Sequence, residues 1–460
     1  MAEGTVGTAS TSVPQPPSVS AAASATAAAD GARRGRGGWV TEDKPATCAG
    51  MVRTLRRMWI RDVRPWGAEP CDVQVEGETI AEVVPAGGAA QGGGTQHDVE
   101  GRGRLLLPAF ADVHVHLDST RLGLPFRPHT GGPGVWTMML NDRRHWREAE
   151  VGIVERVAHT LGLMVARGTT RVRSFAQVDV DAGLERLEAV LAARETHRDR
   201  AEVQVIAFPQ AGLLREEGSA QVLEDALRAG ADVVGGIDPC TLDRDPVRHL
   251  DIVFGLAERY GVPVDVHLHE PGELGRFSAD LILERTVALG MQGHVLISHG
   301  YGLWDGTESQ TRALVERFAE ADVATATVAP GGRQTLPLEL LAEHGVRVGL
   351  GEDGQRDYWS PYGNADMLDR TWQLAFTHGF RRDDLVEHCL AVASRGGASI
   401  MDGDLPRLSG VGDRPGLAVG DRADLLLLEG ETPTAAVMDR SADRTVLHRG
   451  HVVADGLELR

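Results

Sequence analysis

The sequence has almost no lysine: Lys44 is the only one among its 460 residues, and the other basic residues are arginines. A phosphate-binding P-loop and a pyridoxal Schiff base both require a lysine, as does a metal pair bridged by a carbamylated lysine. We expect Lys44 to lie at the margin of a disordered segment. All three chemistries are therefore excluded.

Cysteine, long apolar runs and net positive charge are also scarce. The four cysteines are scattered without a C-x-x-C pair, which suits a reducing cytoplasm. No run approaches the roughly 18 apolar residues of a membrane helix. The formal net charge of −19 repels nucleic acid. We therefore expect a cytoplasmic protein that binds a small molecule, and neither nucleic acid nor membrane.

Composition divides the chain into four segments. Residues 1–45 are rich in Ala, Ser, Thr, Pro and Gly, so they cannot bury enough surface to offset chain entropy, and we expect a disordered low-complexity tail. Short alternating segments in 46–104 and again in 411–460 predict strands. We expect these two segments to complete one small β-sandwich around a separate domain at 105–410.

The segment between them alternates apolar, strand-like runs with amphipathic helical stretches. Such runs are typical of buried parallel strands joined by helices, and eight of them predict a closed (β/α)₈ TIM-like barrel of the α/β class. Barrel enzymes place their chemistry at the C-terminal ends of the strands. The runs cover 105–116, 169–178, 203–210, 231–239, 262–270, 293–300, 323–330 and 346–353.

Histidines and one carboxylate stand at the ends of several of these runs. His114 and His116 are separated by one residue, so on a strand both side chains point to the same face. Two imidazoles and a carboxylate make an open site for Zn²⁺ or Fe²⁺. Because His267, His299 and Asp353 end other runs, they are expected at the same rim of the barrel. The pattern predicts one divalent metal ion.

The chemistry of these groups suggests a hydrolase. A bound divalent ion lowers the pKa of its water toward neutrality. Asp353 and His299 can accept the proton of that water, and Glu270 is suited to carry protons to a ring nitrogen and a leaving amine. This set of groups suits hydrolytic attack on a planar C=N or C=O carbon.

Several segments together resemble the metal-dependent amidohydrolase superfamily, most closely the bacterial cytosine deaminases. They include HVHLDST from 114, IAFPQAG from 206, DVHLHE from 265, SHG from 298 and GEDG from 351. The resemblance covers about 55–450 and implies a homo-oligomer that acts on a heterocyclic small molecule. The residue roles that it implies are metal ligation by His114, His116, His267 and Asp353, proton transfer by Glu270, contact with the attacking water by His299, and reading of the ring's amide edge by Gln210.

The sequence departs from that family pattern at three places. Gly354 stands where the cytosine deaminases carry a second aspartate. Their H-x-D-E motif has become His267-Leu-His269-Glu270, and Phe175-Ala-Gln177 lacks an expected histidine. The metal chemistry is kept while the ring-binding pocket is altered, so a cytosine-like or related nitrogen heterocycle is expected.

Three further side chains are candidate substrate contacts. The Gln210 amide carries a donor and an acceptor side by side, which matches a ureide or amidine edge, although a surface loop also suits it. Trp359 can lie flat against a ring or pack within its own loop. Phe208 has the same strand parity as Gln210, which suits either the cavity or the core.

The sequence therefore predicts a hydrolytic deaminase that releases ammonia from a nitrogen heterocycle. An amidohydrolase that cleaves a cyclic amide or another non-peptide C–N bond would use the same residues and stays an alternative. A catalytically silent barrel that serves as a binding protein is the third.

Overall fold

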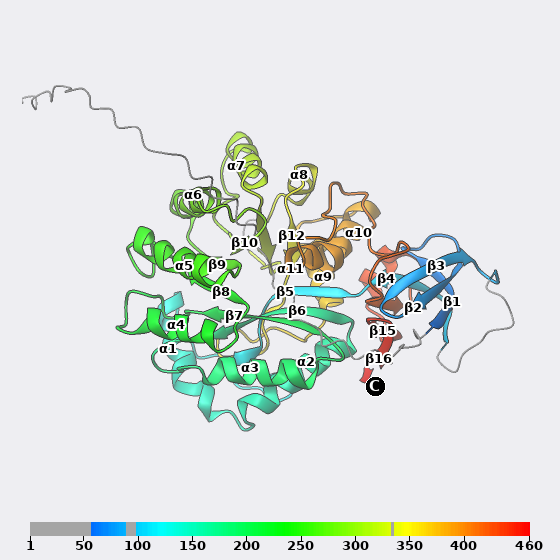
Figure 1. Cartoon of the computed structure of the whole chain (residues 1–460), viewed down its shortest axis with the longest axis horizontal. Coiled ribbons are helices and arrows are strands. Elements are labelled where there is room, and N and C mark those ends of the chain that lie inside the picture. Colours follow the sequence, from blue (N-terminus) through cyan, green and yellow to red (C-terminus); the bar gives the residue numbers. More distant parts are fainter. Residues whose placement is uncertain (1–56, 89–97, 333–334) are drawn as a thin grey trace, which may run out of the picture. The chain divides into compact units, whose positions relative to one another are not determined.

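The computed structural model describes residues 57–88, 98–332 and 335–460, and these residues form two β-sheets (Figure 1). The predicted tail at 1–45 lies outside the described residues. One sheet closes into a barrel, and the other combines strands from both terminal segments.

The barrel contains the eight predicted parallel strands. Consecutive strands pair in parallel, and closure comes from the pairing of β12 with β5, where Leu350 lies opposite Asp112. The short strand β13 (Asp353–Gly354) also pairs with β5. The prediction of a TIM-like barrel is confirmed. Its strands are β5 (Phe110–His116), β6 (Thr169–Gln177), β7 (Glu202–Phe208), β8 (Val233–Ile237), β9 (Val264–Leu268), β10 (Val295–His299), β11 (Val323–Thr327) and β12 (Val348–Leu350).

The first predicted run, 105–116, belongs to two different strands. Residues 105–108 are the last four residues of β4 (Val99–Pro108), which is a strand of the terminal sheet. Strand β5 of the barrel begins at Phe110. At the break, the Ala109 N–H donates to the Asp424 carbonyl over 3.0 Å. Nearly every side chain from Leu105 to Val115 is buried, so hydropathy gives no sign of the transfer between sheets.

Helices connect the strands and cover the outside of the barrel (Figure 1). Helix α5 has a residue that favours each of its ends. Asp245 caps its beginning by accepting from the Arg248 N–H over 3.1 Å, and Gly261 ends it at φ +64°. In the described ranges, no helix has the length and apolar character needed to cross a membrane. The helices are α1 (Val135–His145), α2 (Ile153–Ala166), α3 (Glu185–Thr196), α4 (Ser219–Arg228), α5 (Pro246–Tyr260), α6 (Gly272–Ala288), α7 (Glu308–Glu320), α8 (Leu338–Glu343), α9 (Met367–Thr377), α10 (Asp383–Ala391), α11 (Gly397–Met401) and α12 (Pro433–Asp439).

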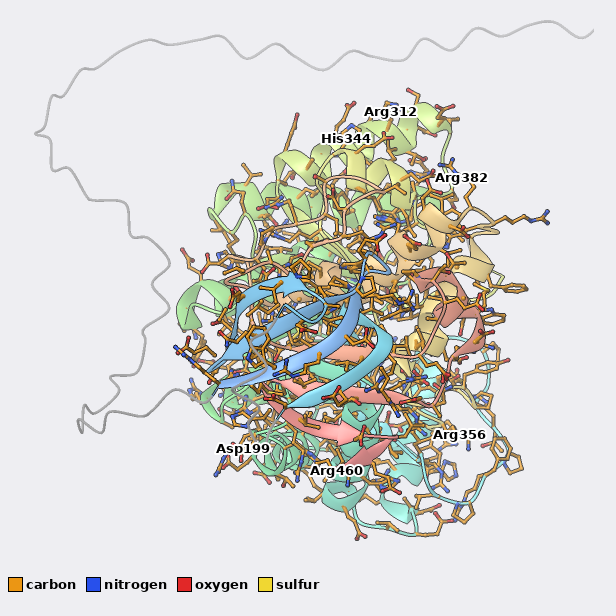
Figure 2. All side chains as sticks on the ribbon, turned by 90° about the vertical axis from the view of Figure 1, so that its right-hand side faces the viewer. Asp199, Arg312, His344, Arg356, Arg382 and Arg460 are labelled. Atoms are coloured by element: carbon orange, nitrogen blue, oxygen red, sulfur yellow. The ribbon has the colours of Figure 1, made fainter. Side chains whose placement is uncertain are left out.

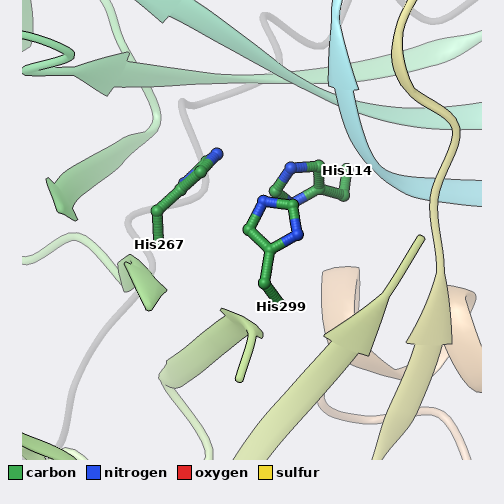
Figure 3. A group of neighbouring side chains, drawn as sticks. All are labelled: His114, His267 and His299. Atoms are coloured by element: carbon green, nitrogen blue, oxygen red, sulfur yellow. The ribbon is translucent and has the colours of Figure 1, made fainter. Parts of the chain in front are cut away.

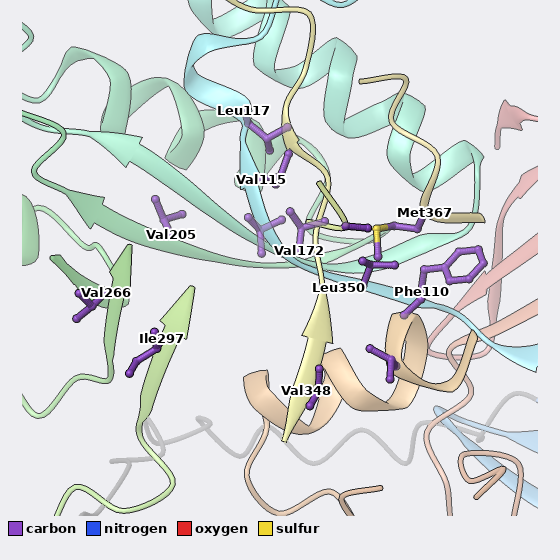
Figure 4. Close-up of a cluster of buried hydrophobic side chains, with 14 of the residues drawn as sticks. Phe110, Val115, Leu117, Val172, Val205, Val266, Ile297, Val348, Leu350 and Met367 are labelled. Carbon is purple, nitrogen blue, oxygen red and sulfur yellow. The ribbon is translucent and has the colours of Figure 1, made fainter. Parts of the chain in front are cut away.

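The main core follows the barrel strands. Val172, Val205, Val266, Ile297 and Leu350 come from five different strands and are fully buried (Figure 4). Burial of such β-branched and aliphatic side chains contributes roughly 1.5–3 kcal/mol each. This packing makes the barrel a rigid support for the residues at its strand ends.

The terminal sheet brings the two ends of the described chain together. Strand β4 lies at its centre, parallel to β1 and antiparallel to β14, and the blue and red ribbons of the two segments lie side by side in Figure 2. The sheet has its own core, which includes Ile60, Val73, Leu106 and Leu427. The predicted composite β unit is therefore present. Its strands are β1 (Arg57–Pro65), β2 (Cys71–Glu76), β3 (Thr79–Pro85), β4, β14 (Leu425–Leu428), β15 (Arg444–His448), β16 (His451–Asp455) and β17 (Glu458–Leu459).

Candidate metal and catalytic centre

Five predicted site residues meet at the C-terminal ends of the barrel strands. His114 and His116 come from β5, His267 from β9, His299 from β10 and Asp353 from β13. Asp353 Oδ1 lies 3.7 Å from His114 Nε2 and 3.5 Å from His116 Nε2. His116 Nε2 and His267 Nε2 are 3.3 Å apart. The rings of His114, His267 and His299 point toward one another (Figure 3).

The backbone at two of these residues adopts an uncommon conformation. His299 has φ +68° and Asp353 has φ +64°, in the left-handed region that residues with a side chain seldom occupy. Strand pairing holds Asp353 in place, since it lies opposite Val115 and Gly354 lies opposite His116. Such strain costs about 1–3 kcal/mol and is concentrated at functional sites.

Several ring nitrogens of this cluster are buried without a hydrogen-bond partner among the described residues. The His114 side chain is 0% exposed, and within the described chain neither ring nitrogen has a hydrogen-bond partner. The same is true of His267 Nδ1. An unpaired buried polar group costs about 1–3 kcal/mol, so these atoms call for a partner. Imidazole nitrogens and a carboxylate oxygen within 4.8 Å of one another are a fitting donor set for Zn²⁺ or Fe²⁺.

Burial also sets the protonation states that a metal site needs. It lowers the pKa of His116 to about 4 and moves the pKa values of His114, His267 and His299 in the same direction. Burial alone would raise the pKa of Asp353, but the nearby imidazoles of His114 and His299 outweigh it and bring that pKa well below its usual range. Neutral imidazoles and an ionised carboxylate are the ligating forms.

Two phenylalanines support the cluster from behind. The Phe208 ring is stacked on His267 with 4.2 Å between centroids, and the Phe175 ring is stacked on His116 at 5.0 Å. Phe208 is 0% exposed and packs behind His267, and its role as a substrate contact stays a prediction. In the sequence, Phe175 stands out only as a departure from the family pattern.

Glu270 is buried behind the rim with its carboxylate fully engaged. Its Oε1 accepts from the Cys240 and Thr241 N–H groups, each over 2.7 Å, and its Oε2 accepts from the Ser278 hydroxyl. Burial raises its pKa, although these hydrogen bonds oppose the shift. These contacts are all with neighbouring loops and α6, so a role in proton transfer stays a prediction.

A second histidine and aspartate lie beside the cluster. The sequence marks His269 as part of the altered H-x-D-E motif, but it does not single out Asp238. His269 Nδ1 lies 2.8 Å from Asp238 Oδ2, and the His269 N–H donates to Asp238 Oδ1 over 2.6 Å. The His269 ring is 4.5 Å from that of His299. Asp238 follows β8, directly beside β9 in the sheet. Its position at a strand end was the only available signal.

His299 has a partner of its own. The Tyr301 hydroxyl lies 2.7 Å from His299 Nδ1, which fixes the orientation of the ring. The sequence had suggested His299 as the partner of water but gave no reason to select Tyr301, because its contact depends on the turn after β10.

The other predicted contacts lie on the loops above β7 and β13. Gln210 is buried in a tight turn, where its N–H donates to the Phe208 carbonyl over 3.0 Å. Trp359 is partly exposed, and its N–H donates to Asp357 Oδ1 over 2.8 Å. A Cβ on Gly354 would lie 2.4 Å from Asp357 Oδ2, which explains why this position lacks a side chain.

The closed parallel barrel, with imidazoles and a carboxylate gathered at its C-terminal strand ends, is the architecture of a barrel enzyme. A family model described as the amidohydrolase family matches residues 136–456, which is well over half of the chain. The chain therefore belongs to the amidohydrolase family, and it is a hydrolase that acts on carbon–nitrogen bonds other than peptide bonds.

Individual relatives agree with this assignment. N-isopropylammelide isopropyl amidohydrolase of Pseudomonas sp. (strain ADP) is 27% identical over 390 residues, which cover 83% of this chain and 93% of the relative. The structure of N-isopropylammelide isopropylaminohydrolase from Burkholderia multivorans matches with a TM-score of 0.81 and 39% identity, covering 88% of this chain and all of that one. The structure of 5-methylcytosine deaminase from Klebsiella pneumoniae matches with a TM-score of 0.69 and 25% identity over 87% of this chain and 98% of that one.

Proposed function

We propose that this enzyme hydrolytically deaminates a cytosine-like or related nitrogen heterocycle and releases ammonia, with one divalent ion, Zn²⁺ or Fe²⁺, at the strand-end cluster. The observation that carries the proposal is the convergence of four imidazoles and one carboxylate from four strands, with the buried His114 ring left without a hydrogen-bond partner among the described residues. The relatives named for ammelide and 5-methylcytosine support a heterocyclic substrate.

His114, His116, His267 and Asp353 are the residues that would hold the ion. Burial keeps the three imidazoles neutral, so their lone pairs are available at neutral pH. When bound, such an ion lowers the pKa of a water molecule toward neutrality and so supplies a nucleophile. Phe175 and Phe208 keep His116 and His267 in place, because each phenylalanine ring stacks on one of them.

His299 and Asp353 are the groups proposed to accept the proton that the attacking water loses. Tyr301 fixes Nδ1 of His299, which leaves Nε2 for this exchange. The water oxygen adds to the amino-bearing ring carbon, the C–N bond then breaks, and ammonia leaves. Gln210 and Trp359 are proposed to hold the amide edge and the face of the ring.

Two groups can deliver the proton to the ring nitrogen and the leaving amine. Glu270 is the group that the sequence favours, but its carboxylate is engaged by Cys240, Thr241 and Ser278. His269 is partly exposed, and Asp238 holds its Nδ1 in the way that orients a general acid. The contacts therefore favour His269, with Asp238 as its positioning residue.

Ammonia release from a panel of heterocycles tests the proposal. The panel contains cytosine, 5-methylcytosine, isocytosine, creatinine and aminotriazines. Asp353→Asn is expected to abolish the release, and His269→Asn is expected to lower kcat by about 10²- to 10⁴-fold as a general acid would. Glu270→Gln distinguishes the two proton carriers, because it should retain most activity if His269 is the acid. Wild-type rates in Asp353→Asn would contradict the proposal.

A second function is favoured by one specific observation. The relative with 39% identity is named an isopropylaminohydrolase, so hydrolysis of an alkylamine substituent uses the same site in an alternative proposal. N-alkylamino-triazines in the panel separate the two, because the product is then an alkylamine and not ammonia.

A further inference from the structure

A pocket lies among the loops next to the metal-ligand strands, and none of the five cluster residues lines it. It has a volume of about 250 Å³, which suits a single ring or its substituent. The loop after β5 and the loop after β13 form its walls, and these strands carry His116 and Asp353. Its lining includes Arg121, Phe126, Arg127, Asn141, Arg356 and Asp357.

Asp357 connects this pocket to the cluster. Its Oδ2 accepts from the Ser119 hydroxyl over 2.9 Å, and Ser119 lies three residues after His116. Its carboxyl group also fills the space next to Gly354, the residue that follows Asp353. The pocket wall is thus in contact with both loops that leave the metal-ligand strands.

The pocket carries more positive than negative charge, in a chain whose net charge is −19. Arg121 and Arg127 both pair with Glu150, at 3.0 and 2.6 Å. The oxygen atoms of Asp357 already accept from Ser119, Trp359 and Ser360. These contacts satisfy the two acidic groups near the pocket.

Arg356 is the third arginine of the pocket lining, and its charge is available to a ligand. Its guanidinium makes no ion pair or hydrogen bond with the described residues, and it is exposed at the edge of the molecule (Figure 2). The planar fork of an arginine matches a carboxylate by two parallel hydrogen bonds. Phe126, which is 67% exposed, adds an apolar surface at the same pocket.

We propose that this pocket binds a carboxylate carried by a planar heterocyclic substrate or product, with Arg356 as the residue that selects acidic over neutral rings. The inference rests on the proposed function, because it makes the pocket an extension of the deaminase site. It assigns the substrate to acidic heterocycles.

Calorimetric titration of the holoenzyme with uracil and its two carboxylates tests this selection. Uracil-5-carboxylate and uracil-6-carboxylate keep the ring of a deaminated cytosine and add only the acid group. A charge-assisted pair favours tighter binding by about tenfold, so at least one carboxylate should bind about tenfold more tightly than uracil. Arg356→Gln should remove this preference, and Arg356→Lys should keep part of it.

Arg381→Gln is the matched control, because Arg381 is an exposed arginine distant in sequence from the pocket loops. It should leave the preference unchanged. Equal binding of all three ligands by the wild type, no binding of either carboxylate, or a preference that survives Arg356→Gln would each overturn the inference. Ammonia release from neutral heterocycles is measured separately. Its absence in the wild type would count against the proposed function, while the carboxylate preference would still decide the role of Arg356.

Discussion

At the scale of single residues, Gly354 and Asp357 share one small volume beside the metal-ligand cluster. The Asp357 carboxyl accepts hydrogen bonds from Ser119 and from two backbone N–H groups, so it cannot move away without losing them. Burial raises its pKa to about 7, which reflects how closely it is enclosed. The glycine at 354 is therefore a packing requirement of this loop.

Gly354→Ala should destabilise the protein by about 1–3 kcal/mol, because the new methyl group would overlap the Asp357 carboxyl. Thermal unfolding measures the effect. In an Asp357→Ala background the same substitution should cost less, because the space is then open, and a double-mutant cycle gives the coupling. Gly255→Ala on α5 is the control, since nothing lies within 4 Å of its Cβ, and it should be neutral or stabilising. Equal costs in both backgrounds would contradict this account.

The sequence could locate the ligand cluster because each of its members has a local signal. His114 and His116 share strand parity, and His267, His299 and Asp353 end apolar runs. The support of these residues could not be foreseen in the same way. Asp238 and Tyr301 have no distinctive motif, and their partners depend on strand order and on the turn after β10.

At the scale of elements, helix α10 contains a buried histidine, His388, that makes the stability of the folded protein depend on pH. Burial lowers the pKa of His388 to about 4, and the positive charge of Arg414 acts in the same direction. Its Nδ1 has no hydrogen-bond partner among the described residues. The folded protein therefore keeps this imidazole neutral, whereas the unfolded chain binds a proton near pH 6.5.

The stability of the protein should therefore fall as the pH drops from about 6.5 to about 4. In this range the unfolded state binds the proton first, and the full effect is about 3 kcal/mol. His388→Gln should reduce the loss of stability between pH 7 and pH 5 by about 2 kcal/mol, as measured by denaturant unfolding at each pH. His451→Gln, at an exposed residue of β16, should follow the wild type. An unchanged pH dependence in His388→Gln would refute the assignment.

The strands of the barrel could be predicted because parallel strands buried on both faces give continuous apolar runs. The same property concealed the boundary at Ala109. Leu105–Pro108 and Phe110–Val115 are equally buried, but the first group pairs with β14 and the second with β6. Only the pairing partners, which are distant in sequence, separate the two strands.

At the scale of the whole molecule, a buried ion pair joins the terminal sheet to the barrel. Arg444 on β15 donates to both oxygens of Asp366, at 2.8 and 3.0 Å, and to the Arg167 carbonyl over 2.9 Å. Asp366 also caps α9 through the Leu368 N–H. The alternating pattern predicted that the two terminal segments form one β unit. It contained no information about this connection, because the partner lies 78 residues away.

Arg444→Ala should destabilise the protein by about 3–5 kcal/mol, because it leaves the carboxylate of Asp366 without its buried partner. Thermal unfolding gives the shift. Arg198→Ala removes an ion pair whose arginine side chain is 63% exposed, so it should cost less than about 1 kcal/mol. Similar shifts for the two variants would show that Arg444 does not connect the two parts as described.

The expected homo-oligomer stays a prediction that analytical ultracentrifugation can check.

The metal content of the purified protein tests the central claim most directly. Elemental analysis by mass spectrometry should find one zinc or iron per chain in the wild type and almost none in His114→Ala and Asp353→Ala, whereas His451→Gln should keep the ion. Removal of the ion with a chelator should stop ammonia release, and Zn²⁺ or Fe²⁺ should restore it. A full complement of metal in both cluster variants, or undiminished ammonia release from protein without metal, would contradict the account.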